Sequence, residues 1–65
     1  GAYQMYAKTK VPIGTKVKTG SVCPESGVWK ADGYVSSDAE APIAKGNRMP
    51  PYKGNAVYWR LIRYA

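Results

Sequence analysis

Aromatic and basic side chains alternate in the last third of the chain, and these are the residues best suited to binding a partner. Tyr52 and Lys53 are adjacent, and Tyr58, Arg60 and Arg63 follow on one segment. Aromatic rings supply contact area, and cations steer a charged partner towards the surface. The same combination occurs on surfaces that bind proteins, single-stranded nucleic acid or sugars. We predict that these five residues form a binding surface.

The residue types needed for catalysis or metal binding are nearly absent. The 65-residue chain has no histidine and one cysteine, which excludes a Cys/His zinc site and an imidazole base. Its four carboxylates are Glu25, Asp32, Asp38 and Glu40. We expect three of them in a turn and a loop, where they form no rigid pair across a substrate. We therefore predict that the protein is not an enzyme and uses no metal or cofactor.

The single cysteine fits a structural role. Cys23 lies at a predicted strand end before a turn, where a small thiol packs under the tryptophans. Its nearest charge is Glu25, which does not favour a reactive thiolate. An intermolecular disulfide is the alternative, and a lone cysteine favours the cytoplasm over an oxidising compartment. We place Cys23 in the core, together with Trp29, Val57, Trp59 and Leu61.

Glycine and proline punctuate the chain so often that a stable helix has little room. There are seven glycines and five prolines. The segments between them predict strands at 4–9, 14–20, 27–34, 41–45 and 55–64. About five short strands indicate an all-β fold, either a small SH3-like barrel or a curled antiparallel sheet. An open three-stranded sheet is the alternative.

Residues 55–64 form the strongest predicted strand. Three apolar residues, Val57, Trp59 and Leu61, alternate with residues 58, 60, 62 and 64, which are aromatic, basic or apolar. A strand that is apolar on both faces lies in the centre of a sheet or pairs with another chain. For this reason we also predict a homo-oligomer.

Shorter patterns predict local features. Asp32-Gly33 is a strong turn signal, so we expect a hairpin in which residues 34–35 pair back onto residues 28–31. Residues 36–40 are small, polar and acidic, which is typical of a mobile loop.

Lys16 and Lys18 lie on one side of a half-exposed strand and protect its edge. Gly14, Gly20 and Gly27 are interpreted as turn residues with positive φ.

The formal charge of +6 is divided along the chain. Residues 25–40 contain all four acids and one base, whereas the segments on either side contain bases only. A positive surface attracts polyanions, acidic proteins or anionic lipid, although net charge also serves solubility. We treat residues 1–65 as one domain, with residues 1–10 as the remainder of a tag, a linker or an added edge strand. We expect no membrane span and no signal peptide.

Three short motifs together resemble a known group of modules. They are Cys23-Pro24-x-Ser26-Gly27-x-Trp29, Gly46-x-x-Met49-Pro50-Pro51 and Tyr58-Trp59-x-Leu61. The arrangement resembles small C-terminal β modules of bacterial proteins associated with Rhs and type VI secretion polymorphic toxins, including immunity-type proteins, and covers residues 19–62. The resemblance implies a non-enzymatic module that docks on a protein partner, and it assigns no binding residue.

We therefore predict a non-catalytic protein-binding module in a bacterial toxin-immunity or secretion context. A small nucleic-acid-binding β-barrel and a carbohydrate- or cell-wall-binding module are the alternatives, because both would use the same aromatic and basic residues.

Overall fold

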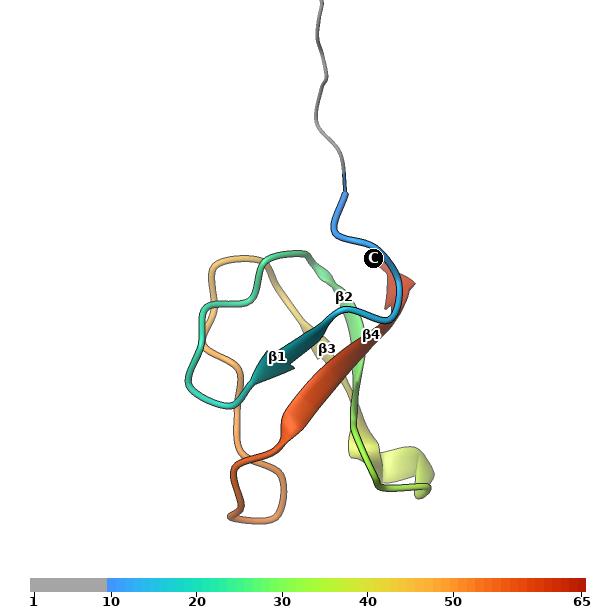
Figure 1. The fold of residues 1–65 in the computed structure, drawn as a ribbon, viewed down its shortest axis with the longest axis vertical. Helices are drawn as coiled ribbons and strands as arrows, with labels where there is room; N and C mark the ends of the chain where they lie inside the picture. The colour runs from blue at the N-terminus through green and yellow to red at the C-terminus, as the bar shows by residue number, and fades with distance from the viewer. Residues whose placement is uncertain (1–9) are drawn as a thin grey trace, which may run out of the picture.

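The computed structural model describes residues 10–65, which form one open antiparallel sheet of four strands (Figure 1). The strands are β1 (Lys16–Lys18), β2 (Gly27–Ala31), β3 (Glu40–Ile43) and β4 (Tyr58–Tyr64), in the order β1-β4-β2-β3. A 3₁₀ helix, η1 (Ser37–Ala39), precedes β3. The all-β prediction is confirmed, and the predicted strand at 4–9 lies outside the described residues. No helix within residues 10–65 is long and apolar enough to cross a membrane.

Strand β4 organises the sheet because it lies between β1 and β2. Trp59 and Leu61 are buried on one of its faces, whereas Tyr58 is exposed on the other. Strand β4 thus lies inside the sheet, the first of the two expected arrangements, although only one of its faces is covered. The second, a homo-oligomer, stays a prediction.

A bulge interrupts the pairing of β2 with β4. Trp29 lies opposite Leu61 but Val28 lies opposite Arg63, so β4 carries one extra residue between these two pairs. Gly27 lies next to the bulge and so close to β4 that an added Cβ would clash with the carbonyl oxygen of Arg63. Gly14 and Gly20 have positive φ as expected, but Gly27 does not. Our interpretation of Gly27 as a positive-φ turn residue was wrong, because this position needs space instead.

The connection between β2 and β3 also differs from the predicted hairpin. The chain does turn at Gly33, and the Tyr34 amide donates to the Ala31 carbonyl at 3.2 Å. Residues 34–35 then form no strand, and the Tyr34 ring packs edge-on against the Tyr52 ring with 4.7 Å between the ring centres. The antiparallel partner of β2 is β3. Residues 36–40, predicted as a loop, contain η1 with a buried Ala39 and the first residue of β3.

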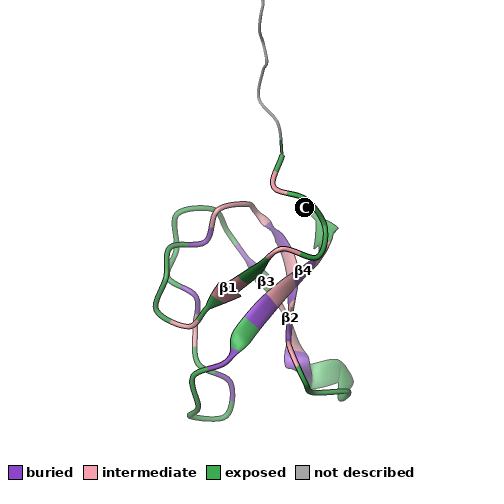
Figure 2. Cartoon of the chain, in the orientation of Figure 1, coloured by how far each residue is buried: buried purple, intermediate pink, exposed green. Residues whose placement is uncertain are grey.

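One face of the sheet is covered by two irregular segments, residues 19–26 and 44–57 (Figures 1 and 2). Backbone hydrogen bonds join the segments: Gly20 N donates to Met49 O, Met49 N to Ser21 O, and Cys23 N to Asn47 O. The core lies between these segments and the sheet. It contains Cys23, Trp29, Ala31, Ala39, Ile43, Met49, Tyr52, Val57, Trp59 and Leu61, and so includes all five residues predicted for it.

Each tryptophan connects the sheet to its cover. Trp29 Nε1 donates to the Glu25 carbonyl oxygen at 3.1 Å, and Trp59 Nε1 donates to the Pro50 carbonyl oxygen at 2.7 Å. A buried indole N–H needs such an acceptor. The two rings therefore fill the core and also fix the position of both covering segments.

We expect Gly27→Ala to lower the free energy of unfolding by about 1–3 kcal/mol, the usual cost of overpacking. The added methyl group would meet the Arg63 backbone and the Leu61 side chain. The measurement is urea unfolding followed by tryptophan fluorescence. The control is Gly14→Asn, since Gly14 has positive φ with open space around it and asparagine tolerates that conformation. Equal stability of Gly27→Ala and the wild type would contradict the close approach.

Candidate binding face

The face of the sheet opposite the core is open to solvent. In the strand register, Lys16 lies opposite Arg60 and Lys18 opposite Tyr58, while Lys30 lies opposite both Arg60 and Glu40. The residues that alternate with them, such as Val17 and Trp29, pack in or against the core. We define the open face as Lys16, Lys18, Val28, Lys30, Asp32, Glu40, Tyr58, Arg60 and Arg63, none of which is buried.

The open face carries charges of both signs with an excess of positive charge. It holds five cations and two carboxylates, a net charge of +3. Half of the formal charge of the whole chain is thus gathered on one side of the sheet. An acidic partner would be attracted to this side.

Asp32 forms ion pairs with two of the strands. Its Oδ2 lies 2.8 Å from Lys16 Nζ on β1, and its Oδ1 lies 3.6 Å from Arg60 Nε on β4. The hydrogen bond from Lys16, aided by the Arg60 charge, holds the pKa of Asp32 below its usual value. On the opposite side of the face, Arg63 Nη2 lies 3.1 Å from Glu40 Oε1.

Tyr58 is the aromatic residue of the open face. Its side chain is 54% exposed, and Lys18 Nζ lies 5.7 Å from the centre of its ring. An exposed ring beside a cation presents both apolar area and charge to a partner. These are the properties of residues that dominate protein interfaces.

Three of the five predicted binding residues share this face: Tyr58, Arg60 and Arg63. Tyr52 does not, because it is only 8% exposed and packs edge-on against Trp59 in the core. Lys53 is exposed in the turn at residues 52–55, on the core side of the sheet. The structure therefore separates these two residues from the other three, because Tyr52 lies in the core and Lys53 lies outside the open face. A tyrosine can lie in the core when its hydroxyl group has a hydrogen-bond partner, which for Tyr52 is Asp38. The sequence of residues 52–53 does not indicate this partner.

The lysines of the open face were not among the predicted binding residues. Lys16 and Lys18 gave a signal, since their alternation with Val17 predicted an exposed strand side, and β1 is indeed an edge strand. For Lys30 the sequence gave no such signal beyond its alternation with the neighbouring buried residues. Its place beside Arg60 depends on the pairing of β2 with β4, which the sequence pattern did not specify.

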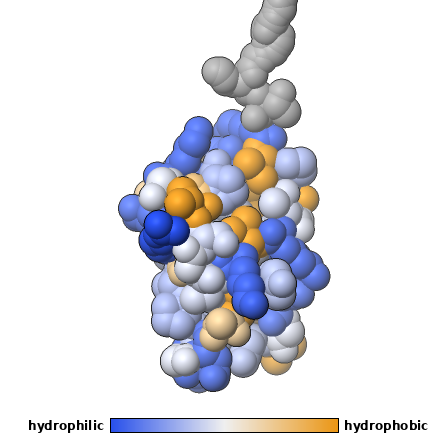
Figure 3. Space-filling view, turned by 60° about the vertical axis from the view of Figure 1, so that its left-hand side comes forward, coloured by the Kyte–Doolittle hydropathy of each residue, from blue (hydrophilic) through white to orange (hydrophobic). Residues whose placement is uncertain are grey.

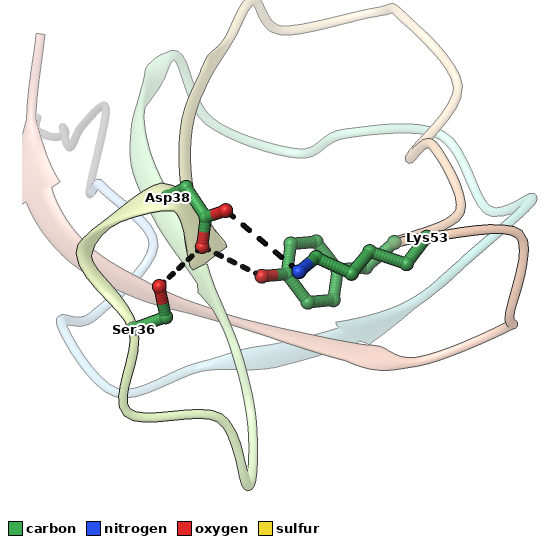
Figure 4. A network of polar contacts seen from close by, with 4 residues as sticks. Ser36, Asp38 and Lys53 are labelled. Carbon is green, nitrogen blue, oxygen red and sulfur yellow. Dashed lines mark hydrogen bonds and ion pairs between the residues drawn. The ribbon is translucent and has the colours of Figure 1, made fainter.

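A second polar cluster lies on the core side and has a structural role (Figure 4). Asp38 accepts hydrogen bonds from the hydroxyl groups of Ser36 and Tyr52, the latter at 2.8 Å, and its second oxygen lies 3.9 Å from Lys53 Nζ. The cluster connects η1 to the turn at residues 52–55. The hydrogen bond from Ser36 and then that from Tyr52 hold the pKa of Asp38 below its usual value. The same bond to Asp38 raises the pKa of Tyr52.

The other chemically interesting positions contribute no site. Cys23 is buried, and its thiol donates to the Glu25 carbonyl oxygen at 3.2 Å. Within the described part of the chain, no three cysteine, aspartate or glutamate side chains gather as metal ligands. The surface seen in Figure 3 is mostly hydrophilic, and its apolar residues form separate spots rather than one broad patch.

Comparison with known protein families, with curated proteins and with solved structures gives no match. The function of the chain has to be inferred from the geometry of the open face and from the motifs in its own sequence.

We expect stability to decrease at both ends of the pH range because of the Asp38–Tyr52 pair. The folded pKa of Asp38 lies below the usual 3.8, so its contribution is complete above that pH and is lost as pH falls through the lower, folded value. The folded pKa of Tyr52 lies above the usual 10.0, so its contribution is complete below that pH and is lost as pH rises through the folded value.

The test is urea unfolding of the wild type and Tyr52→Phe from pH 2 to 11. In Tyr52→Phe the free energy of unfolding should fall less steeply at acid pH than in the wild type. At alkaline pH it should lack the decrease that comes from Tyr52. Tyr58→Phe, which removes an exposed hydroxyl, serves as the control and should follow the wild type. Identical pH profiles for the Tyr52 and Tyr58 variants would rule out this linkage.

Proposed function

We propose that the chain is a non-catalytic protein-binding module that uses the open face of its sheet. The observation that carries this proposal is the register of β4 with its neighbours. It gathers Tyr58, Arg60 and Arg63 with the lysines of β1 and β2 on one solvent-exposed surface. Tyrosine and arginine are the residues most often responsible for affinity at protein interfaces.

The charges of this surface indicate the nature of the partner. A net charge of +3 favours an acidic protein surface, and long-range attraction would accelerate its association. The resemblance to toxin-associated modules favours a partner from a bacterial toxin-immunity or secretion system. This context rests on the three sequence motifs alone.

The alternatives have less support in the geometry. A carbohydrate-binding module would stack sugars on exposed rings, but Trp29 and Trp59 are buried. A nucleic-acid-binding module would stack successive bases on several rings, whereas among residues 10–65 Tyr58 is the single aromatic residue of the open face. The positive charge of that face is the one observation that favours nucleic acid.

A homo-oligomer stays a prediction, and the strand edges limit how it would form. Edge strand β3 contains Pro42, which has no N–H to donate, and edge strand β1 carries Lys16 and Lys18. Proline and lysine at edges discourage pairing with another sheet. These edges favour binding of a second copy through a face of the sheet. Light scattering across micromolar concentrations would detect it as a mass above that of the monomer.

We expect Tyr58→Ala to weaken partner binding by at least about tenfold, as truncation of an aromatic residue that dominates an interface does. The partner is first captured from the native host with the immobilised wild-type chain, then purified, and its dissociation constant is measured. Lys53→Ala is the control, because Lys53 is exposed outside the open face, and should stay within about twofold of the wild type. Equal effects of the two substitutions, or recovery of nucleic acid alone, would overturn the proposal.

A further inference from the structure

The four acids of the chain divide equally between the open face and the rest of the molecule. Asp32 and Glu40 lie on the open face. Glu25 accepts a hydrogen bond from the Val11 amide at 3.1 Å, and Asp38 binds Tyr52 on the core side. Two carboxylates therefore interrupt a surface whose other charged residues are all cations.

Their positions leave no line of uninterrupted positive charge across the sheet. Lys16, Arg60 and Lys30 form a row across three strands, and the same row ends in Glu40 on the fourth. With strands about 4.8 Å apart, the row spans roughly 14 Å. Asp32 lies beside the first two cations of the row and is paired with both.

The ion pairs of the open face are exchangeable. The side chains of Lys16, Asp32 and Arg60 are all between 36% and 52% exposed, so water competes for them and they hold one another weakly. Lys18 and Lys30 form no ion pair within residues 10–65. A partner carboxylate can therefore bind these two lysines directly, whereas elsewhere on the face it must compete with Asp32 or Glu40.

This arrangement discriminates between two kinds of acidic partner. A nucleic-acid backbone carries a negative charge at every step, so a strand crossing the face meets repulsion at Asp32 and at Glu40. A protein surface can place carboxylates opposite Lys18 and Lys30 and basic residues opposite the two acids. Specific interfaces commonly combine such attraction with repulsion of the wrong partner.

We infer that Asp32 and Glu40 are specificity-determining residues of the open face, which reject polyanions and select a protein surface with charges of both signs. This inference rests on the proposed function, because it explains how a basic face can prefer a protein over nucleic acid. The ion pairs of these two acids are exposed and contribute little to stability, so stability alone does not account for their presence.

The experiment measures binding of a fluorescently labelled oligothymidylate of 20 nucleotides by anisotropy at low salt. Asp32→Asn/Glu40→Gln should bind it at least about tenfold more tightly than the wild type, with a steeper dependence on salt. The matched control is Glu25→Gln/Asp38→Asn, since each double variant raises the formal charge from +6 to +8. The control should gain less than about threefold, because its added charge lies away from the face.

Three results would overturn the inference: no gain for Asp32→Asn/Glu40→Gln, equal gains for both double variants, or tight binding by the wild type. Circular dichroism and thermal unfolding establish that each variant is folded. If a double variant is unfolded, the single variants Glu40→Gln and Glu25→Gln carry the same comparison. The capture experiment with Tyr58→Ala is independent of the oligonucleotide, so failure of the proposed function and failure of this inference give different results.

Discussion

Two buried indole rings determine which face of the sheet is closed. Trp29 on β2 and Trp59 on β4 occupy the same face of the two central strands, and each donates a hydrogen bond to a carbonyl oxygen of a covering segment. The chain has no phenylalanine, so these rings supply much of the apolar area that a domain of this size must bury. Once both rings face one way, residues 19–26 and 44–57 have to cover that side.

The open face is a direct consequence of this arrangement. Side chains alternate along a strand, so residues next to a buried tryptophan point to the opposite side. Lys30 follows Trp29, and Tyr58 and Arg60 flank Trp59. These residues of the open face therefore owe their common orientation to the core, and pairing of β4 with both β1 and β2 brings them together. Because side chains alternate, each central strand turns one side to the core and the other side to solvent.

Local pattern predicted segments that overlap all four strands of residues 10–65 and half of the core residues, but long-range pairing decided which residues share the open face. Alternation over residues 55–64 predicted β4, and Cys23, Val57 and the tryptophans were recognisable as core residues from size and composition. No local signal brings Lys30 beside Arg60, since their contact depends on two strands about 30 residues apart. The place of Tyr52 in the core was not predictable, because tyrosine suits surface and core equally well, and only Asp38, distant in sequence, fixes its hydroxyl. Gly27 was misjudged because the bulge that requires it forms between β2 and β4.

Asp32 combines a local role with a long-range one. In the turn that ends β2, asparagine would serve as well as aspartate, because both side chains suit the same turn conformations. What aspartate adds is a charge, and that charge lies 2.8 Å from Lys16 on β1 and 3.6 Å from Arg60 on β4. Exposed ion pairs of this kind contribute little to stability. The distinctive effect of the carboxylate is therefore on the electrostatic surface that a partner meets, where one negative charge beside two cations changes both the strength and the selectivity of attraction.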